Sequence, residues 1–372
     1  MSVVVTRADL YRVELPLVHH FRTSSHDKTH LAHLLVRLEA SDGAVGWGEC
    51  ASPSDPFYVG ETVETCWHVL RTYLLPGLLG RAWEHPHDAA ALLARVRGNE
   101  FAHAGVETAA WDLWARRHDL PLAKALGGTR TSITSGVSLG IEPSLDALVE
   151  RVGEFVAQGY ARIKLKIAPG WDLEPVAAVR ERFGDVPLQV DANGAYPVTA
   201  ATRLVDLDRF DLLMVEQPFA PGELTAHAWL QGQLTTPVCL DESITSPGIA
   251  AVALDLGAAR IVNVKVSRLG GLGAAVAVHD LCHERGIPVW CGGMHEFGVG
   301  RAANVALASL PGFSLPGDIS GSDKYYARDV VDPAIVAVDG EVAVPWDRPG
   351  TGHDVDEAVL AEHVVAHEEF RA

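Results

Sequence analysis

The sequence has no cluster of lysine or arginine and no long apolar run. Its formal net charge is −18 at pH 7, and its basic residues form no patch. This argues against nucleic acids and anionic membrane surfaces as partners. No stretch approaches the roughly 20 apolar residues of a membrane-spanning helix, and residues 1–17 lack the basic start, apolar core and cleavage site of a signal peptide. We therefore expect a soluble, cytoplasmic protein.

Cysteine is also scarce. The five cysteines are widely spread and no CxxC pair occurs, so neither a disulfide framework nor a zinc cluster is indicated. We expect reduced, mostly buried thiols. The chain has 372 residues, which exceeds one domain of ~150 residues and leaves room for a barrel of roughly 250.

Two kinds of pattern follow each other along the chain. Residues 3–17 and 33–49 are rich in β-formers with a hairpin signal at Asp42-Gly43, and helical patterns follow at about 61–74, 87–96 and 102–118. From about residue 132, short β runs alternate with amphipathic helices; the runs are 135–139, 161–166, 188–191, 212–216, 238–241, 260–265 and 288–291. Such units imply parallel strands with right-handed crossovers, and their number favours a closed barrel over an open doubly wound sheet. After about residue 322 the alternation ends, and we expect the tail to pack back on the first domain.

Three successive β runs of this second part end in an acid. Asp191 ends LQVD, Glu216 ends LLMVE and Asp241 ends VCLD, at intervals of 25 residues. Singly, each acid could be a helix cap or a solvated loop residue. Together they would converge at the C-terminal face of a barrel, where barrel enzymes place their active sites. Three converging carboxylates repel one another, and a hard cation such as Mg²⁺ or Mn²⁺ removes that repulsion.

Lysines occupy the strands on either side of these acids. Lys164 and Lys166 lie two apart in ARIKLKI and therefore point to the same face of one strand. A solvated pair is one interpretation; the other is that each ammonium opposes protonation of its neighbour and lowers its pKa. Lys265 ends the sixth run, across an eight-stranded barrel from the second. Lys166 and Lys265 would then flank a substrate from opposite sides, as removal of a proton α to a carboxylate requires while a metal stabilises the enediolate.

This lysine–carboxylate–lysine pattern resembles the enolase superfamily, in particular the o-succinylbenzoate synthase and N-succinylamino acid racemase family of its muconate-lactonizing subgroup. The resemblance covers nearly the whole chain and includes ARIKLKIAPGWD, QVDAN, VEQP, CLDES, GIPVWCGGM and GRAANVALASLPGFSLPGDIS. It implies an α/β fold with a modified (β/α)7β TIM-type barrel at 131–321. An α+β capping domain at 1–130 and a C-terminal segment at 322–372, packed back on it, would complete the fold. It also implies a homo-oligomer.

The resemblance also implies roles for individual residues. Asp191, Glu216 and Asp241 would bind Mg²⁺ or Mn²⁺, Lys166 and Lys265 would be the acid–base pair, and Lys164 would be an auxiliary charge. The residues expected to contact a small carboxylate substrate are Ser138, Asn193, Arg268, Met294 and His295 on the barrel and Phe21, Arg22, Thr23 and Tyr58 on the capping domain. The stretch His295 to Phe297 departs from the family pattern at positions expected to border the side-chain pocket.

Several activities share this constellation. The first is o-succinylbenzoate synthase, a syn-dehydration in menaquinone biosynthesis with Lys166 as base and then as acid. The second is racemisation of N-succinyl or other N-acyl amino acids by both lysines. In the resembled family, members able to racemise have an arginine at the position of Arg268. A cycloisomerase or dipeptide epimerase is third. A non-catalytic relative that only binds a metal or carboxylate is disfavoured because every ligand and lysine is present.

One further motif is a glycine-rich run. RLGGLG, from Arg268 to Gly273, resembles a phosphate-binding loop. It lacks the Lys-Ser/Thr of a Walker motif and opens no dinucleotide-binding unit. We therefore expect a barrel turn there and no nucleotide site.

Overall fold

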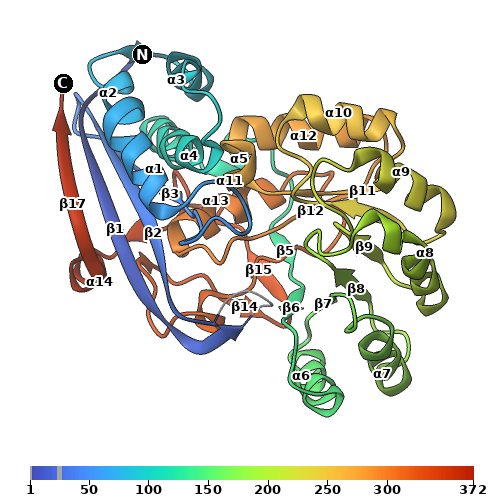
Figure 1. The fold of residues 1–372 in the computed structure, drawn as a ribbon. Coiled ribbons are helices and arrows are strands. Elements are labelled where there is room, and N and C mark those ends of the chain that lie inside the picture. The colour runs from blue at the N-terminus through green and yellow to red at the C-terminus, as the bar shows by residue number, and fades with distance from the viewer. Residues whose placement is uncertain (1, 23–26) are drawn as a thin grey trace.

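A computed structural model describes residues 2–22 and 27–372 and shows two regions side by side (Figure 1). The capping region has an antiparallel sheet in the order β17-β1-β2-β3, with β4 also paired to β1. Its strands are β1 (Val3–Arg22), β2 (Asp27–Ala40), β3 (Val45–Cys50), β4 (Ala82–Trp83) and β17 (Val364–Arg371). Its helices are α1 (Val63–Val69), which continues through a π-helical turn at Leu70–Leu74, then α2 (Leu75–Leu78), α3 (Pro86–Leu93), α4 (Glu100–Arg117) and α5 (Leu122–Ala125).

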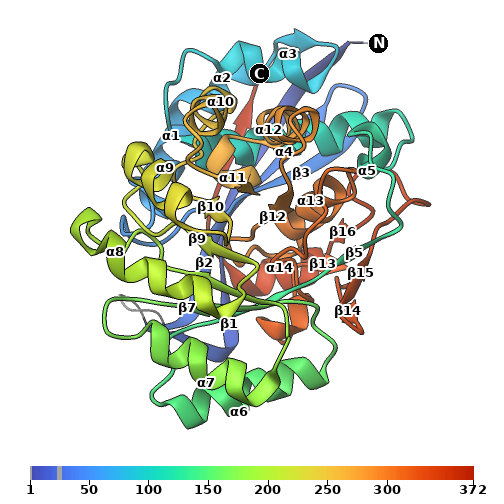
Figure 2. The same cartoon turned by 90° about the vertical axis from the view of Figure 1, so that its right-hand side faces the viewer.

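The second region contains a seven-stranded parallel sheet in the order β12-β11-β10-β9-β8-β7-β6. Its strands are β6 (Val137–Leu139), β7 (Ile163–Lys166), β8 (Leu188–Asp191), β9 (Met214–Glu216), β10 (Val238–Leu240), β11 (Ile261–Val264) and β12 (Val289–Cys291). The helices are α6 (Leu145–Ala157), α7 (Leu173–Phe183), α8 (Ala201–Leu204), α9 (Leu224–Gln233), α10 (Pro247–Asp255), α11 (Val266–Leu269), α12 (Leu272–Glu284) and α13 (Gly298–Ala308). Figure 2 shows these helices outside the strands. The seven predicted strands are confirmed.

An eighth stretch closes the sheet into a barrel. Phe313 forms a parallel bridge with Val289 on one side, and Gly317 forms one with Ser135 on the other. The Asp318 amide also donates to the Cys291 carbonyl at 2.9 Å. The predicted (β/α)7β barrel is thus confirmed. With eight strands in the ring, β7 and β11 lie opposite each other.

The end of the chain joins the beginning. β17 pairs with β1 in an antiparallel register from Arg7–Arg371 to Val13–Val364, and Figure 1 shows it along the outer edge of the capping sheet. The elements between α13 and β17 are β13 (Val331–Asp332), β14 (Ala337–Val338), β15 (Glu341–Ala343), β16 (Asp354–Val355) and α14 (Glu357–His363), and β15 pairs with β5 (Ser132–Thr134). No helix in the described residues is long and apolar enough to cross a membrane.

The capping sheet lies directly against α4. A Cβ atom added at Gly48 would lie 2.2 Å from the Gly105 carbonyl oxygen, and one added at Gly46 would lie 2.3 Å from the Leu113 amide nitrogen. Because both obstacles are backbone atoms of a helix, no side chain can move aside. Glycine at these positions therefore allows β3 to pack against α4.

We predict that Gly48→Ala lowers the free energy of unfolding by about 1–3 kcal/mol or more, the usual cost of overpacking a closed interior. Gly60→Ala is the matched control, because a Cβ atom there meets nothing within 4 Å. Urea unfolding followed by circular dichroism measures both. Equal midpoints for the two variants would contradict this account of the interface between β3 and α4.

Candidate active site

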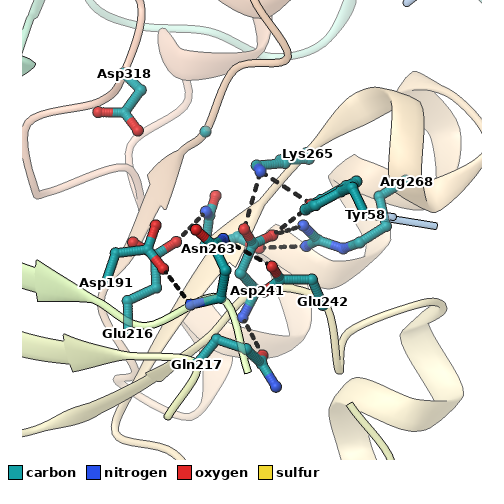
Figure 3. Close-up of polar contacts among 12 residues, drawn as sticks. Tyr58, Asp191, Glu216, Gln217, Asp241, Glu242, Asn263, Lys265, Arg268 and Asp318 are labelled. Atoms are coloured by element: carbon teal, nitrogen blue, oxygen red, sulfur yellow. Dashed lines mark hydrogen bonds and ion pairs between the residues drawn. The ribbon is translucent and has the colours of Figure 1, made fainter. Parts of the chain in front are cut away.

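Three carboxylates meet at the C-terminal ends of neighbouring barrel strands. Asp191 and Glu216 are the last residues of β8 and β9 and are paired in register, and Asp241 directly follows β10. All three side chains are buried, and Figure 3 shows them gathered around one region of the barrel mouth. The parallel register brings the three acids together, as their spacing in the sequence predicted.

Lys166 and Lys164 approach the acids from β7. The Lys166 Nζ lies 2.6 Å from the Asp191 Oδ2 and also donates to the Asn193 side chain. The Lys164 Nζ lies 3.4 Å from the same Asp191 oxygen and 3.2 Å from the Glu216 Oε2. One carboxylate therefore holds both ammonium groups on the same side of the site.

Carboxylates surround the Lys164 ammonium. Burial lowers the pKa of this ammonium, but Asp318, Glu216 and Asp191 together raise it well above its ordinary value. The carboxylates around Lys164 therefore outweigh burial and the neighbouring cation Arg162, and the expected effect of the two lysines on each other stays a prediction. Lys164 stays protonated, as an auxiliary positive charge must.

Lys265 and Arg268 hold the opposite side of the site through Asp241. The Lys265 Nζ lies 2.9 Å from the Asp241 Oδ2, and the Arg268 guanidinium binds the other oxygen. Arg268 also donates to the carbonyl oxygens of Ile244 and Asn263 at 2.8 and 2.6 Å. Burial lowers the pKa of Lys265 and Arg268 lowers it further, but Asp241, Tyr58 and Glu242 together raise it well above its ordinary value.

Tyr58 brings the capping region into the site. Its hydroxyl accepts a hydrogen bond from the Lys265 Nζ at 3.0 Å and donates to the Asp241 Oδ1 at 3.2 Å, and Figure 3 shows it beside both residues. The Lys265 ammonium also lies 4.7 Å from the centre of the Tyr58 ring. Tyr58 thus contacts the catalytic candidates themselves, in addition to its expected place at the mouth.

The carboxylate oxygens of Asp191, Glu216 and Asp241 are the type of ligand that a hard divalent cation prefers, although here they bind lysine and arginine side chains. Burial, Asp191 and Asp241 together raise the pKa of Glu216 to about 8 although Lys164 and Lys166 lower it, as expected for three acids that repel one another. In the described part of the chain, no three His, Cys, Asp or Glu side chains form a ready metal-ligand cluster. The buried oxygen donors fit Mg²⁺ in kind. Their present partners are the Lys164, Lys166, Lys265 and Arg268 cations, the side-chain amides of Gln189 and Asn263, the Tyr58 hydroxyl and the Asn193 backbone amide.

The expected substrate-contact residues of the barrel surround this centre. The exposed Asn193 lies between Lys166 and Glu242 and donates to the Glu242 carboxylate at 2.8 Å. Ser138 donates to Asp318 at 3.2 Å. Met294 is half-buried against the core of the capping region, and the half-buried His295 stacks on Tyr325 with ring centres 4.9 Å apart.

Four further residues were expected near the mouth: the structure contradicts the expectation for Phe297 and does not test those for Phe21, Arg22 and Thr23. Phe297 was expected to border the side-chain pocket, and this is wrong. It is fully buried and packs against His33, with ring centres 4.6 Å apart, in the cluster that joins the capping sheet to the C-terminal segment. Phe21 and Arg22 end β1, but their side chains lie outside the described part of the structure, and Thr23 lies outside the described residues.

Sequence reasoning missed Asp318. It lies on the closing stretch, with its Oδ2 at 2.6 Å from the Lys164 Nζ and its Oδ1 at 2.8 Å from the Arg162 guanidinium. Arg162 is buried, and both Arg162 and Lys164 lie over the Trp290 ring at 5.1 and 4.8 Å from its centre. An acid near the end of an eighth strand was the available signal, but the stretch LPGDIS carries no regular β pattern.

We predict that Asp318→Asn lowers the free energy of unfolding by about 3–5 kcal/mol, because it breaks a pair with two buried cations. Those cations hold the pKa of Asp318 below its ordinary value, so its contribution is complete above about pH 4 and is lost as the pH falls further. The control Asp255→Asn disrupts an exposed pair with Arg285 and should cost at most about 1 kcal/mol. Urea unfolding at pH 7 and pH 3 measures both. A variant as stable as the control at pH 7 would refute the prediction.

Comparisons with known proteins identify the family of this chain. The model of the mandelate racemase / muconate lactonizing enzyme N-terminal domain matches residues 3–127, and the enolase C-terminal domain-like model matches residues 147–359. An o-succinylbenzoate synthase from Geobacillus kaustophilus is 47% identical over 356 residues, with 96% of this chain and 95% of the relative covered. An N-succinylamino acid racemase from Amycolatopsis is 48% identical over 345 residues, with 92% and 93% covered. The structure of an enolase superfamily member from Listeria innocua superposes with a TM-score of 0.96 at 39% identity and covers 99% of both chains. The chain belongs to the mandelate racemase and muconate lactonizing enzyme family of the enolase superfamily.

Proposed function

We propose that this protein is an o-succinylbenzoate synthase, which removes the α-proton of a small carboxylate and then eliminates water. The observation that carries the proposal is the pair of lysines on opposite barrel strands, each held by a buried carboxylate: Lys166 by Asp191 and Lys265 by Asp241. Similarity to synthases over nearly the whole chain supports this reaction.

Lys166 would carry both proton transfers of a syn-dehydration. Its neutral amine takes the α-proton, the carbon–oxygen bond at the neighbouring carbon breaks, and the ammonium so formed gives its proton to the departing hydroxide as water. Base and acid act on one face of the substrate, so one side chain suffices. Lys265 faces the other side and stays protonated through its pairing with Asp241, so it serves as a fixed positive charge.

Asp191, Glu216 and Asp241 would hold Mg²⁺ or Mn²⁺. When bound, the ion supplies positive charge that offsets their mutual repulsion and stabilises negative charge developing on the substrate carboxylate. Glu242 lies beside this set, with its pKa raised to about 7 by burial and by Asp241. Asn193, which joins Lys166 to Glu242, would orient the base toward the substrate.

Racemisation of N-succinylamino acids is the second candidate. It needs Lys265 to give and take protons, and Arg268 favours this because it binds the same Asp241 carboxylate and lowers the pKa of Lys265. The similarity to a racemase is as high as that to the synthases. The other elements of the proposal are a cytoplasmic location, a homo-oligomeric assembly, a place in menaquinone biosynthesis, and domains at 1–130, 131–321 and 322–372.

A side-by-side assay of the Mg²⁺-loaded protein tests the proposal. One arm follows dehydration of the cyclohexadiene substrate of o-succinylbenzoate synthases, and the other follows α-proton exchange of N-succinyl amino acids in D₂O by NMR. We predict fast dehydration that Lys166→Ala abolishes without change in folding or Mg²⁺ binding. Exchange from both enantiomers without dehydration would replace the synthase by a racemase, and activity in neither arm would overturn both.

We predict that Arg268→Gln slows racemisation at least about tenfold more than dehydration, because only racemisation needs Lys265 to lose its proton. Both rates are measured on one preparation, so the ratio does not depend on how much of the variant is folded. Equal losses in the two reactions would show that Arg268 acts only through the stability of the site.

A further inference from the structure

The glycine-rich run RLGGLG forms the turn between α11 and α12. Gly270 and Gly271 have φ angles of 85° and 134°, which side chains rarely allow. A Cβ atom at Gly271 would lie 2.4 Å from the Glu107 Oε2, and one at Gly270 would lie 2.6 Å from the Glu100 Oε2. The two glycines therefore let α4 of the capping region press directly on this turn.

Glu107 occupies the place where such a loop would hold an anion. Its Oε2 accepts from the Leu272 amide at 2.7 Å, and its Oε1 accepts from the Gly273 amide at 2.9 Å and the Trp111 indole at 2.8 Å. The N-terminus of a helix attracts negative charge, and phosphate-binding loops use the same free amides. Burial raises the pKa of Glu107, and although the two amides and the indole lower it, the net value is about 7. The ligand of the RLGGLG turn is thus a carboxylate of the chain itself.

The same turn is directly connected to the active site. α11 begins immediately after Lys265 and contains Arg268, and it packs against α4. The Leu269 amide donates to the Lys265 carbonyl at 3.2 Å, and the Gly271 amide donates to the Val266 carbonyl at 3.0 Å. The one-turn helix α11 is therefore attached to β11 at its start, and Glu107 binds the turn at its end. Lys265 and Arg268, the two cations that bind Asp241, lie in this short segment.

We propose that Glu107 is a positioning residue for the reaction: by holding the capping region on the RLGGLG turn, it fixes the wall that carries Lys265 and Arg268. The effect on turnover rests on the proposed function, because it requires Lys265 and Lys166 to face opposite sides of the substrate. The structural half of the proposal is independent of which reaction the site performs.

A second capping residue supplies a matched control. Glu49 on β3 accepts from the Phe297 and Gly300 amides at 2.9 and 2.8 Å, at the start of α13, and from His33 at 2.7 Å. Its carboxylate is buried like that of Glu107 and joins the same two regions. It caps the helix after β12, however, and that helix carries neither Lys265 nor Arg268.

The experiment compares wild type with Glu107→Ala, Glu107→Gln and Glu49→Gln. Amide hydrogen exchange of residues 265–275 reports on the turn, and α-proton exchange of each enantiomer of an N-succinyl amino acid in D₂O reports on the two walls. Lys265→Ala identifies the enantiomer that depends on Lys265. For Glu107→Ala we expect amide exchange in 265–275 to quicken at least about tenfold. We also expect exchange of the Lys265-dependent enantiomer to slow about tenfold more than that of the other.

The variants separate positioning from stability. Glu107→Gln should lie between wild type and Glu107→Ala, because its amide oxygen still accepts one of the bonds, and Glu49→Gln should leave the ratio between enantiomers unchanged. Unchanged amide exchange in 265–275, or equal slowing of both enantiomers by Glu107→Ala, would overturn the proposal. If wild type exchanges neither enantiomer, the racemase arm of the proposed function fails, and amide exchange still decides whether Glu107 holds the turn.

Discussion

The structure depends on the burial of carboxylates at the ends of neighbouring parallel strands. A buried charge without compensation is strongly unfavourable, so each acid requires a cation or donor within reach. The barrel provides these from two sides: Lys164 and Lys166 from β7, and Lys265 with Arg268 from β11 and the turn that follows it. The same electrostatic requirement that stabilises the site also places an ammonium group on each side of the space above it.

Carboxylates also join the two regions of the molecule. Glu107 and Glu49 belong to the capping region but bind the amides that begin α12 and α13 of the barrel. Lys265 lies between β11 and α12, and the Met294–His295 stretch lies between β12 and α13. An apolar cluster and the pairing of β17 with β1 add to this contact. The mouth is consequently built from both regions, and Tyr58 reaches Lys265 because the capping region is held in place.

The reactions of the similar synthases and racemases share a first step, removal of the α-proton, and differ in the step that follows. Synthase and racemase relatives are about equally similar to this chain. In the proposed function the two reactions differ in whether Lys265 keeps its proton, and Lys265 and Arg268 each bind one oxygen of Asp241. Phe297 is buried in the interior, whereas Met294 and His295 are half-buried.

The sequence by itself determined the parts of the protein that follow from local periodicity. Strand positions, the three acids at intervals of 25 residues and the alternation that places Lys164 and Lys166 on one face could all be predicted, because each depends on neighbours in the chain or on a repeating unit. Tertiary structure alone decided the closing stretch at 313–318, the pairing of Asp318 with Lys164, the buried place of Phe297 and the contact of Tyr58 with Lys265. Each of these contacts joins residues far apart in the sequence, and no repeating pattern in the sequence predicts it. The RLGGLG run illustrates both sides: the sequence predicted a turn there, and only the packing of α4 showed that the amides of Leu272 and Gly273 bind the Glu107 carboxylate.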